Sequence, residues 1–182
     1  MDSIEEILRK KHLFVLFYGN CFIPLSLVCL KYLQNAQLNS KGLYFLQGRT
    51  ATPAYLSKVL GELDRKFIQR LTIVPLLDPL YQFIVVNTLD TFVDNYDWTI
   101  FDDFFANFLI IRGLAKNLRT ISIMFEQISK LKEISRKHSI LIIITAVEEI
   151  KSIVPIDRVK DAADVVVRVE HREGEIVATI EE

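Results

Sequence analysis

Eight residues, Gly19 to Ser26 (GNCFIPLS), have the spacing of a phosphate-binding loop. That loop is a Gly, four variable residues and then Gly-Lys-Ser or Gly-Lys-Thr. Its backbone N–H groups surround the phosphates, and its Lys adds positive charge. Gly19 and Ser26 keep the first and last positions, but Pro24 replaces the second Gly and Leu25 replaces the Lys. Because Pro24 has no N–H and Leu25 has no charge, we predict a degenerate loop that binds nucleotide weakly or not at all.

A nucleotide site of this kind also needs a carboxylate that orders Mg²⁺ at the end of an apolar strand. Residues 82–89 (QFIVVNTL) are predicted to form such a strand, and Asn87 stands where the Asp would be. An Asn is neutral and holds a metal-bound water poorly. The alternative is that Asn87 simply caps the end of a strand.

Length and composition restrict the class of protein. A chain of 182 residues that is 51% hydrophobic and 25% charged fits a single globular domain, 1–182. Its net charge of −1 argues against a general attraction to nucleic acid. Cys21 and Cys29 lie in one apolar stretch, which favours a reduced, cytoplasmic protein. The three histidines are scattered and no CxxC is present, so we predict no metal and no cofactor.

Apolar runs alternate with helical patterns along the chain. The predicted strands are residues 12–19, 42–48, 71–77, 82–89 and 139–147. Helices are predicted over 24–38, opening with Pro24, after Thr52-Pro53, and along the three- and four-residue steps from Leu114 to Ile134. Residues 97–103 (DWTIFDD) are predicted to start a helix with Thr99 as its cap. Residues 1–11 are a short charged lead-in with a helical turn, and 163–182 alternate about REGE like an antiparallel hairpin.

Residues Leu13 to Leu30 carry no charge, so a membrane span must be considered. The stretch is short for a span and is interrupted by Gly19, Asn20 and Pro24. A buried strand that runs into a buried helix explains both the missing charge and the interruption. The fold class is therefore α/β, with a mostly parallel sheet between two helical layers and a C-terminal antiparallel hairpin.

Several stretches resemble the RecA/RadA recombinase family, in particular its short paralogues that consist of the core alone. These stretches are LFVLFYGN, FIVVNTLDTF, RGLAKNLRTI, HSILIIITAV and the terminal DAADVVVRVEHREGEIVATI. The resemblance covers nearly all of 12–182 and implies a RecA-like three-layer sandwich. The positions that carry catalysis in the family are altered, with Leu25 for the Lys, Asn87 for the Asp and Ala146-Val147 for Asn-Gln. The resemblance therefore implies a pseudo-ATPase with no catalytic residues.

Family members bind DNA through two loops, and the first corresponds here to LDTFVDNYDWTIFDD, residues 89–103. Its five carboxylates (Asp90, Asp94, Asp97, Asp102 and Asp103) would repel a phosphate backbone. A basic helical face that begins with Arg112, Lys116 and Arg119 and continues through Lys130, Lys132, Arg136 and Lys137 is the candidate DNA contact. A solvated helix face is the favoured alternative.

Aromatic residues are dense between positions 92 and 108. Seven in seventeen residues are more than one helix stripe can bury, and aromatic side chains anchor protein interfaces. We expect part of this run, with Phe92, Tyr96, Trp98 and Phe101 as the candidates, to contact a partner or a second copy. The alternative is that most of the run is core, which is favoured for Phe101, Phe104, Phe105 and Phe108 on one predicted helix.

Three functions follow from these patterns. The first is a non-catalytic recombinase paralogue, an accessory or regulatory protein in homologous recombination and DNA repair that contacts a RecA-fold partner. The second is a scaffold of the related KaiC-like group in signalling or motility assembly. The third is a slow ATPase with a divergent site. The sequence leaves open the partner, the oligomeric state and any direct contact with DNA.

Overall fold

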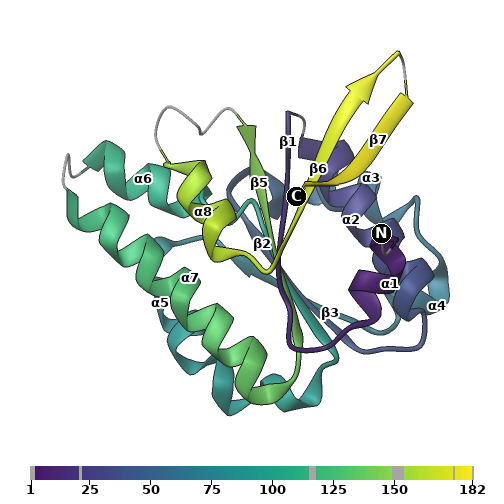
Figure 1. The fold of residues 1–182 in the computed structure, drawn as a ribbon, viewed down its shortest axis with the longest axis horizontal. Helices are drawn as coiled ribbons and strands as arrows, with labels where there is room; N and C mark the ends of the chain where they lie inside the picture. The colour runs from purple at the N-terminus through teal and green to yellow at the C-terminus, as the bar shows by residue number, and fades with distance from the viewer. Residues whose placement is uncertain (1–2, 21, 115–117, 149–153, 174, 182) are drawn as a thin grey trace.

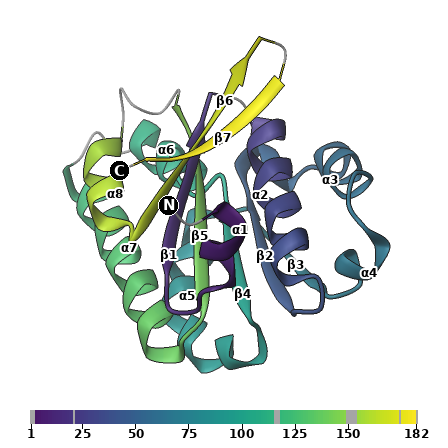
Figure 2. The same cartoon turned by 45° about the vertical axis from the view of Figure 1, so that its right-hand side comes forward.

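A single β-sheet organises the molecule, with helices packed on both of its faces (Figures 1 and 2). The computed structural model describes residues 3–20, 22–114, 118–148, 154–173 and 175–181. In this part of the chain the sheet has seven strands in the order β3-β2-β4-β5-β1-β6-β7. Neighbouring strands are parallel except for the antiparallel pair β6–β7. The strands are β1 Phe14–Gly19, β2 Gly42–Gln47, β3 Leu71–Leu76, β4 Trp98–Asp102, β5 Leu141–Val147, β6 Val165–Arg172 and β7 Glu175–Glu181.

The helices divide between the two faces of the sheet (Figure 2). One face carries α1 Ile4–Arg9, α2 Phe22–Gln37, α3 Pro53–Leu60 and α4 Arg65–Ile68. The other carries α5 Pro79–Thr88, α6 Ala106–Leu114, α7 Leu118–His138 and α8 Ile156–Ala162. Short 3-10 turns, η1 Gly48–Ala51, η2 Leu89–Thr91 and η3 Val93–Asn95, complete the connections. The architecture is the predicted three-layer α/β sandwich with a C-terminal antiparallel hairpin.

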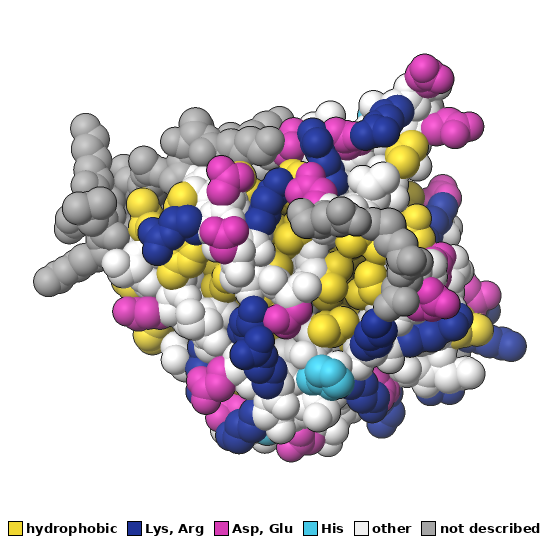
Figure 3. Space-filling view, viewed as in Figure 1, with side chains coloured by type: hydrophobic (Ala, Val, Ile, Leu, Met, Phe, Trp, Pro, Cys, Tyr) yellow, Lys and Arg dark blue, Asp and Glu magenta, His cyan; other side chains and the backbone are white. Residues whose placement is uncertain are grey.

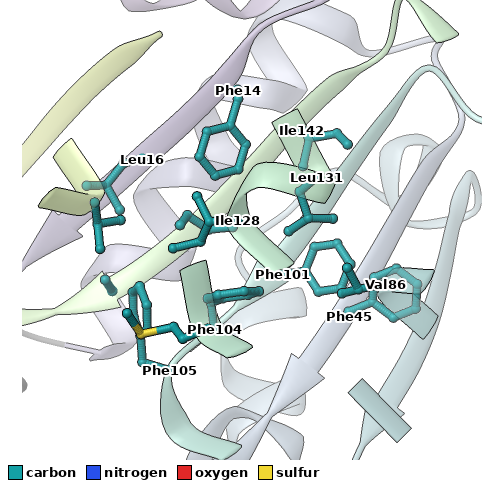
Figure 4. Close-up of a cluster of buried hydrophobic side chains, with 14 of the residues drawn as sticks. Phe14, Leu16, Phe45, Val86, Phe101, Phe104, Phe105, Ile128, Leu131 and Ile142 are labelled. Carbon is teal, nitrogen blue, oxygen red and sulfur yellow. The ribbon is translucent and has the colours of Figure 1, made fainter. Parts of the chain in front are cut away.

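Strand alternation builds a core on each face of the sheet. Phe14, Leu16 and Tyr18 point toward α5–α8, where Figure 4 shows the first two among other buried side chains. Val15 and Phe17 point toward α1–α4. All five side chains are essentially inaccessible to water. This two-sided burial explains why the strand reads as a continuous apolar run.

The apolar stretch Leu13 to Leu30 is β1 followed by α2, as expected for a buried strand and helix. No helix in the described ranges is both long and apolar enough to cross a membrane. The lead-in contains the predicted helical turn, α1. Its N-cap Ser3 forms a capping box with Glu6.

Two element predictions are wrong, and they are adjacent in the chain. Residues 82–89 are not a strand, because 82–88 continue α5 and Leu89 begins η2. The start of α5 is fixed by the N-cap Asp78 and by Pro79 in the first turn. Residues 98–102 are not a helix start, because they form β4, and Thr99 is a buried strand residue and not a cap. A short apolar run has no periodicity that distinguishes a buried strand from a buried helix. For this reason the helical stretch at 82–89 is predicted as a strand, and the strand at 98–102 as a helix start.

Candidate functional site

Parallel α/β sheets bind ligands at the carboxyl ends of their strands. At that edge of this sheet, β1 ends at Gly19, β2 at Gln47, β4 at Asp102 and β5 at Val147. The predicted nucleotide loop leaves from Gly19. Any site for a nucleotide and its metal ion must therefore be sought among these strand ends.

The connection from β1 to α2 is short. Strand β1 ends at Gly19, and α2 already begins at Phe22. In a phosphate loop, by contrast, the residues between the first Gly and the Gly-Lys-Ser/Thr form a loop ahead of the helix. Pro24, Leu25 and Ser26 therefore lie within α2, where their backbone cannot surround a phosphate. The side chains of Phe22, Ile23 and Pro24 lie outside the described residues.

Gly19 and Leu25 both serve internal packing. A Cβ atom on Gly19 would lie 2.2 Å from the carbonyl oxygen of Val169 on β6, so the close approach of the two strands requires a glycine here. The side chain of Leu25 is 1% exposed and packs in the core between the sheet and α1–α4, near Cys29. It occupies the position of the loop Lys in sequence, but it points into the protein.

Asp102, at the end of β4, is a buried carboxylate held by four hydroxyl groups. Ser26 Oγ lies 2.6 Å from Oδ1 and 2.7 Å from Oδ2, and Thr145 Oγ1 donates to Oδ1 at 2.6 Å. Tyr44 and Tyr55 donate to Oδ2 at 2.6 Å and 3.0 Å. The hydroxyls come from α2, β5, β2 and α3. We call these five residues the Asp102 cluster, and it joins Ser26 of α2 to the end of β4.

The chemistry of the Asp102 cluster is that of a closed hydrogen-bond network. A carboxylate has about four acceptor positions, and four hydroxyl donors fill them. Burial, reinforced by the charge of Asp102, raises the pKa of Tyr44 and of Tyr55 well above the usual value, so both phenols stay protonated donors. In the described part of the chain, no three His, Cys, Asp or Glu side chains could together hold a metal ion.

Neighbouring groups extend the Asp102 cluster. Thr145 Oγ1 also accepts the backbone N–H of Asp103 at 2.8 Å. Burial, with the charge of Asp102 as a second cause, raises the pKa of the Cys29 thiol well above its usual value. Thr145 and Cys29 are both nearly fully buried beside the Asp102 carboxylate. The arrangement favours a rigid joint between strands and helices over an open coordination site.

Asn87 is not part of this site. It lies on α5, and its Nδ2 donates to the carbonyl oxygen of Phe83 at 2.8 Å, one helical turn back. It borders a groove between α5 and α7 that also includes Phe125 and Arg158. The prediction that Asn87 replaces an Asp at a strand end is therefore wrong, because residues 82–89 are not a strand. The carboxylate at the strand end is present, and it is Asp102.

The sequence does contain a pattern that indicates Asp102 as the carboxylate at a strand end. WTIFD is an apolar run that ends in an acidic residue, and all five of its residues are buried. That is the pattern of a strand covered on both faces with a polar residue at its carboxyl end. Thr99, three residues before Asp102, predicted a helix cap instead.

The interface predicted from aromatic density is wrong for two of its four residues. Trp98 and Phe101 are 0% exposed, since both are core residues of β4. Phe101 stacks on Phe45 with ring centroids 4.6 Å apart, and Figure 4 shows this pair beside Val86. Phe92 and Tyr96 are half-buried against the same core. The aromatic run is therefore mainly interior packing.

The exposed apolar surface lies elsewhere. Most of the large exposed hydrophobic side chains of the described residues gather on and next to α5. We call this set the α5 patch, and its members are Leu77, Leu80, Tyr81, Phe83, Ile84 and Ile110.

The predicted carboxylate-rich loop is also dispersed by the fold. Asp102 and Asp103 are buried at the carboxyl edge of the sheet. Asp97 precedes β4 and accepts the N–H of Lys41, while Asp90 and Asp94 pair with residues at the end of α7. These five carboxylates do not form one repelling surface, so this argument against DNA contact is wrong.

The candidate DNA-binding face is covered only in part by the described residues. Lys116 lies outside them, as do the side chains of Arg112 and Arg119, so their contact with DNA stays a prediction. Farther along α7, basic side chains pair with carboxylates: Lys130 with Glu133, Lys132 and Arg136 with Asp164, Lys137 with Asp90 and His138 with Asp94. Figure 3 shows charges of both signs interspersed on this side of the molecule. This part of α7 is a charge-balanced surface.

Comparison with known proteins identifies the fold. No protein-family model matches the sequence, and comparison with curated proteins finds no match either. A solved structure titled "Crystal structure of the RadB recombinase" aligns with a TM-score of 0.68 at 17% identity, over 95% of this chain and 82% of that one. The chain therefore has a RecA-like fold. With 552 solved chains matching, the likeness defines an architecture, and function has to be argued from the site.

Proposed function

We propose that this protein is a non-catalytic RecA/RadA-like paralogue, an accessory or regulatory protein in homologous recombination and DNA repair that acts through protein contacts. The observation that carries the proposal is the Asp102 cluster. The one carboxylate at the expected strand end has its acceptor positions filled by hydroxyl groups of Ser26, Tyr44, Tyr55 and Thr145. A metal ion would have to displace these donors and enter a site in which Asp102 is only 1% exposed.

The start of α2 supports the same conclusion independently. The residues that would form the phosphate cradle are helical from Phe22 onward, and Leu25 is buried in the core. Neither the N–H groups of a loop nor the charge of a Lys is available to the β- and γ-phosphates. Phosphate contacts supply much of the affinity for ATP, so we expect very weak binding.

The RecA-like fold supports the choice of partner. The protein of similar fold is titled a recombinase. We therefore propose a RecA-fold recombinase or paralogue as the partner, or self-association, and the cytoplasm as the location. Contact with DNA is weak or indirect in this proposal, because the described half of α7 is charge-balanced.

The slow divergent ATPase is the second candidate, and one observation favours it. Ser26 and Asp102 occupy the positions of the loop hydroxyl and the strand-end carboxylate, and they are in direct hydrogen-bond contact. In nucleotide-binding proteins of this type the same two groups hold Mg²⁺. A rearrangement that withdraws Tyr44 and Tyr55 would expose them.

Titration calorimetry with Mg-ATP separates the two candidates. The non-catalytic protein should show no measurable heat of binding, which means a dissociation constant above about 1 mM. A low-micromolar dissociation constant would establish a nucleotide site. Release of phosphate from ATP measured on the same preparation checks hydrolysis directly. Co-purification from native cells, analysed for RecA-fold proteins, then tests the accessory role. Recovery of none would remove the support for a recombinase partner.

A further inference from the structure

The α5 patch consists of apolar side chains that are exposed to solvent and not packed in the core of the protein. Only Gln82 and Val86 of α5 are buried, yet Leu80 and Tyr81 are 63% and 64% exposed. Leu77, just before the helix, is 71% exposed. A surface helix normally turns polar residues toward water. This one turns leucine, isoleucine and aromatic side chains outward, which is typical of a surface that another protein covers.

The helix is also free of charge. Residues 79–89 contain no Asp, Glu, Lys or Arg. The nearest acid on the amino side, Asp78, is engaged as the N-cap and accepts the N–H of Leu80 at 2.6 Å. On the carboxyl side Asp90 is paired with Lys137 at the end of α7. A surface without net charge neither attracts nor repels a charged partner, so the patch selects for an apolar counterpart.

A groove runs along one side of the patch. Its volume is about 440 Å³, and Leu80, Phe83 and Ile110 border it together with Ile123 from α7. The groove makes this surface uneven, so side chains of an opposing surface can insert between α5 and α6. An uneven surface of this kind allows a larger contact area than a flat helix face.

We propose that the α5 patch is the contact surface for a second copy of this chain, in a dimer with two-fold symmetry in which the two α5 helices face each other. Two-fold symmetry places each residue near the axis close to its own counterpart, so any charge on α5 would meet a like charge. The uncharged sequence of α5 removes that repulsion. A partner of different sequence would not need this property, and this favours a second copy.

The size of the patch predicts the strength of association. Its six residues expose roughly 600 Å² in total, given about 150–250 Å² for each isolated large side chain. A stable interface buries about 800 Å² on each partner. The α5 patch is near the lower limit, so we expect reversible dimers with a dissociation constant on the order of micromolar or weaker. This inference deepens the self-association named in the proposed function and rests on it. It does not depend on nucleotide binding, so titration with Mg-ATP tests the non-catalytic role separately from dimerisation.

Sedimentation velocity over protein concentrations from about 1 to 100 µM tests the proposal. The unaltered protein should shift from monomer to dimer across this range. Ile84→Glu and, separately, Ile84→Lys should each stay monomeric, because Ile84 lies in the middle of α5. Mixing the two variants should restore a dimer, since a two-fold axis brings Glu and Lys together. Ile176→Glu is the matched control, as Ile176 is also an exposed isoleucine, at 42%, but lies on β7 away from the patch.

Each result has a definite meaning. Circular dichroism and thermal unfolding should be unchanged in all three variants, since the substituted side chains are exposed. A monomer at every concentration would overturn the proposal, and so would an equal effect of Ile176→Glu. If the single variants are monomeric but their mixture does not dimerise, the contact is not two-fold and the proposed symmetry is wrong. A partner captured by the α5 patch of a protein that never dimerises would identify a heterologous interface instead.

Discussion

The carboxyl ends of β1 and β4 lie at the same edge of the sheet, but they differ in which parts of a nucleotide site they provide. After β1 the chain enters α2 without a loop for phosphate, and Leu25 is packed into the core. At the end of β4, by contrast, the carboxylate and the hydroxyl that contacts it are present as Asp102 and Ser26. The difference shows that a buried polar group at this edge has an internal role where it joins elements of the fold, as Asp102 does. A phosphate cradle has no such internal role, because its N–H groups serve only the ligand.

The comparison makes its strongest prediction for Asp102. Asp102→Ala leaves four buried hydroxyls without their acceptor, so the free energy of unfolding should fall by about 4 kcal/mol. Asp102→Asn keeps one acceptor oxygen and should lose about half as much. Urea denaturation followed by circular dichroism measures both, with Asp90→Ala as a partly exposed control. A carboxylate kept only for a metal ion would behave in the opposite way, since its removal would relieve burial of charge and raise stability.

The second largest effect is expected at Leu25. Leu25→Lys introduces the Lys of a phosphate loop, but the Leu25 side chain that it replaces is only 1% exposed. Burial of an unpaired ammonium group should cost about 3 kcal/mol of unfolding free energy. Mg-ATP binding should not appear, because the residues around it remain helical. Leu25→Met, which conserves volume, should cost less than about 1.5 kcal/mol. Gain of ATP binding by Leu25→Lys would show that the loop is intact and would break the comparison.

Gly19 should behave as a packing residue. Gly19→Ala brings a methyl group against the carbonyl oxygen of Val169, and one strand must shift, so we expect a loss of about 2 kcal/mol in unfolding free energy. The nearby Asn20→Ala is exposed and should change stability by less than about 0.5 kcal/mol. Thermal unfolding of both variants gives the contrast. Equal stability of the two variants would mean that close packing of β1 against β6 does not require a glycine at position 19.

The smallest effect concerns Asp164, a carboxylate held by cations instead of hydroxyls. It accepts the N–H of Phe14, at the amino end of β1, and pairs with Lys132 at 2.9 Å. Burial raises the pKa of Asp164, but the bonds from Lys132 and Phe14 outweigh burial and leave that pKa below its usual value. A lowered folded-state pKa means that the stabilisation is present above the unfolded pKa of about 3.9 and is lost as the pH falls through the folded value.

Asp164→Asn should therefore lower the unfolding free energy by roughly 1 kcal/mol at pH 7 and by less at pH 3. Urea denaturation at the two pH values measures the difference between variant and parent. A difference that does not shrink in acid would assign the effect of Asp164 to packing and not to its charge.

Much of the fold could be predicted from the sequence, because local patterns were sufficient where they were long or flanked by clear signals. Strand β1 ends at a glycine, and the long helix α7 has a regular apolar stripe beside a charged face. The hairpin β6–β7 alternates about its turn. The failures were confined to residues 79–102, where a helix and a strand are both short and apolar. The predicted site failed with them, because assigning residues 82–89 to a strand places Asn87, and not Asp102, at the strand end.

The sequence by itself determined that Pro24 has no N–H and Leu25 no charge to offer a phosphate in any fold. It also determined that residues 79–89 carry no charge. Only the tertiary structure decided which carboxylate lies at the strand end and what surrounds it. The partners of Asp102 come from Ser26, Tyr44, Tyr55 and Thr145, which are far apart in the chain. Hydrogen bonds between distant residues depend on the packing of the whole sheet, and no local pattern encodes them. For the same reason, burial of Trp98 and exposure of Tyr81 could not be told from their residue types alone.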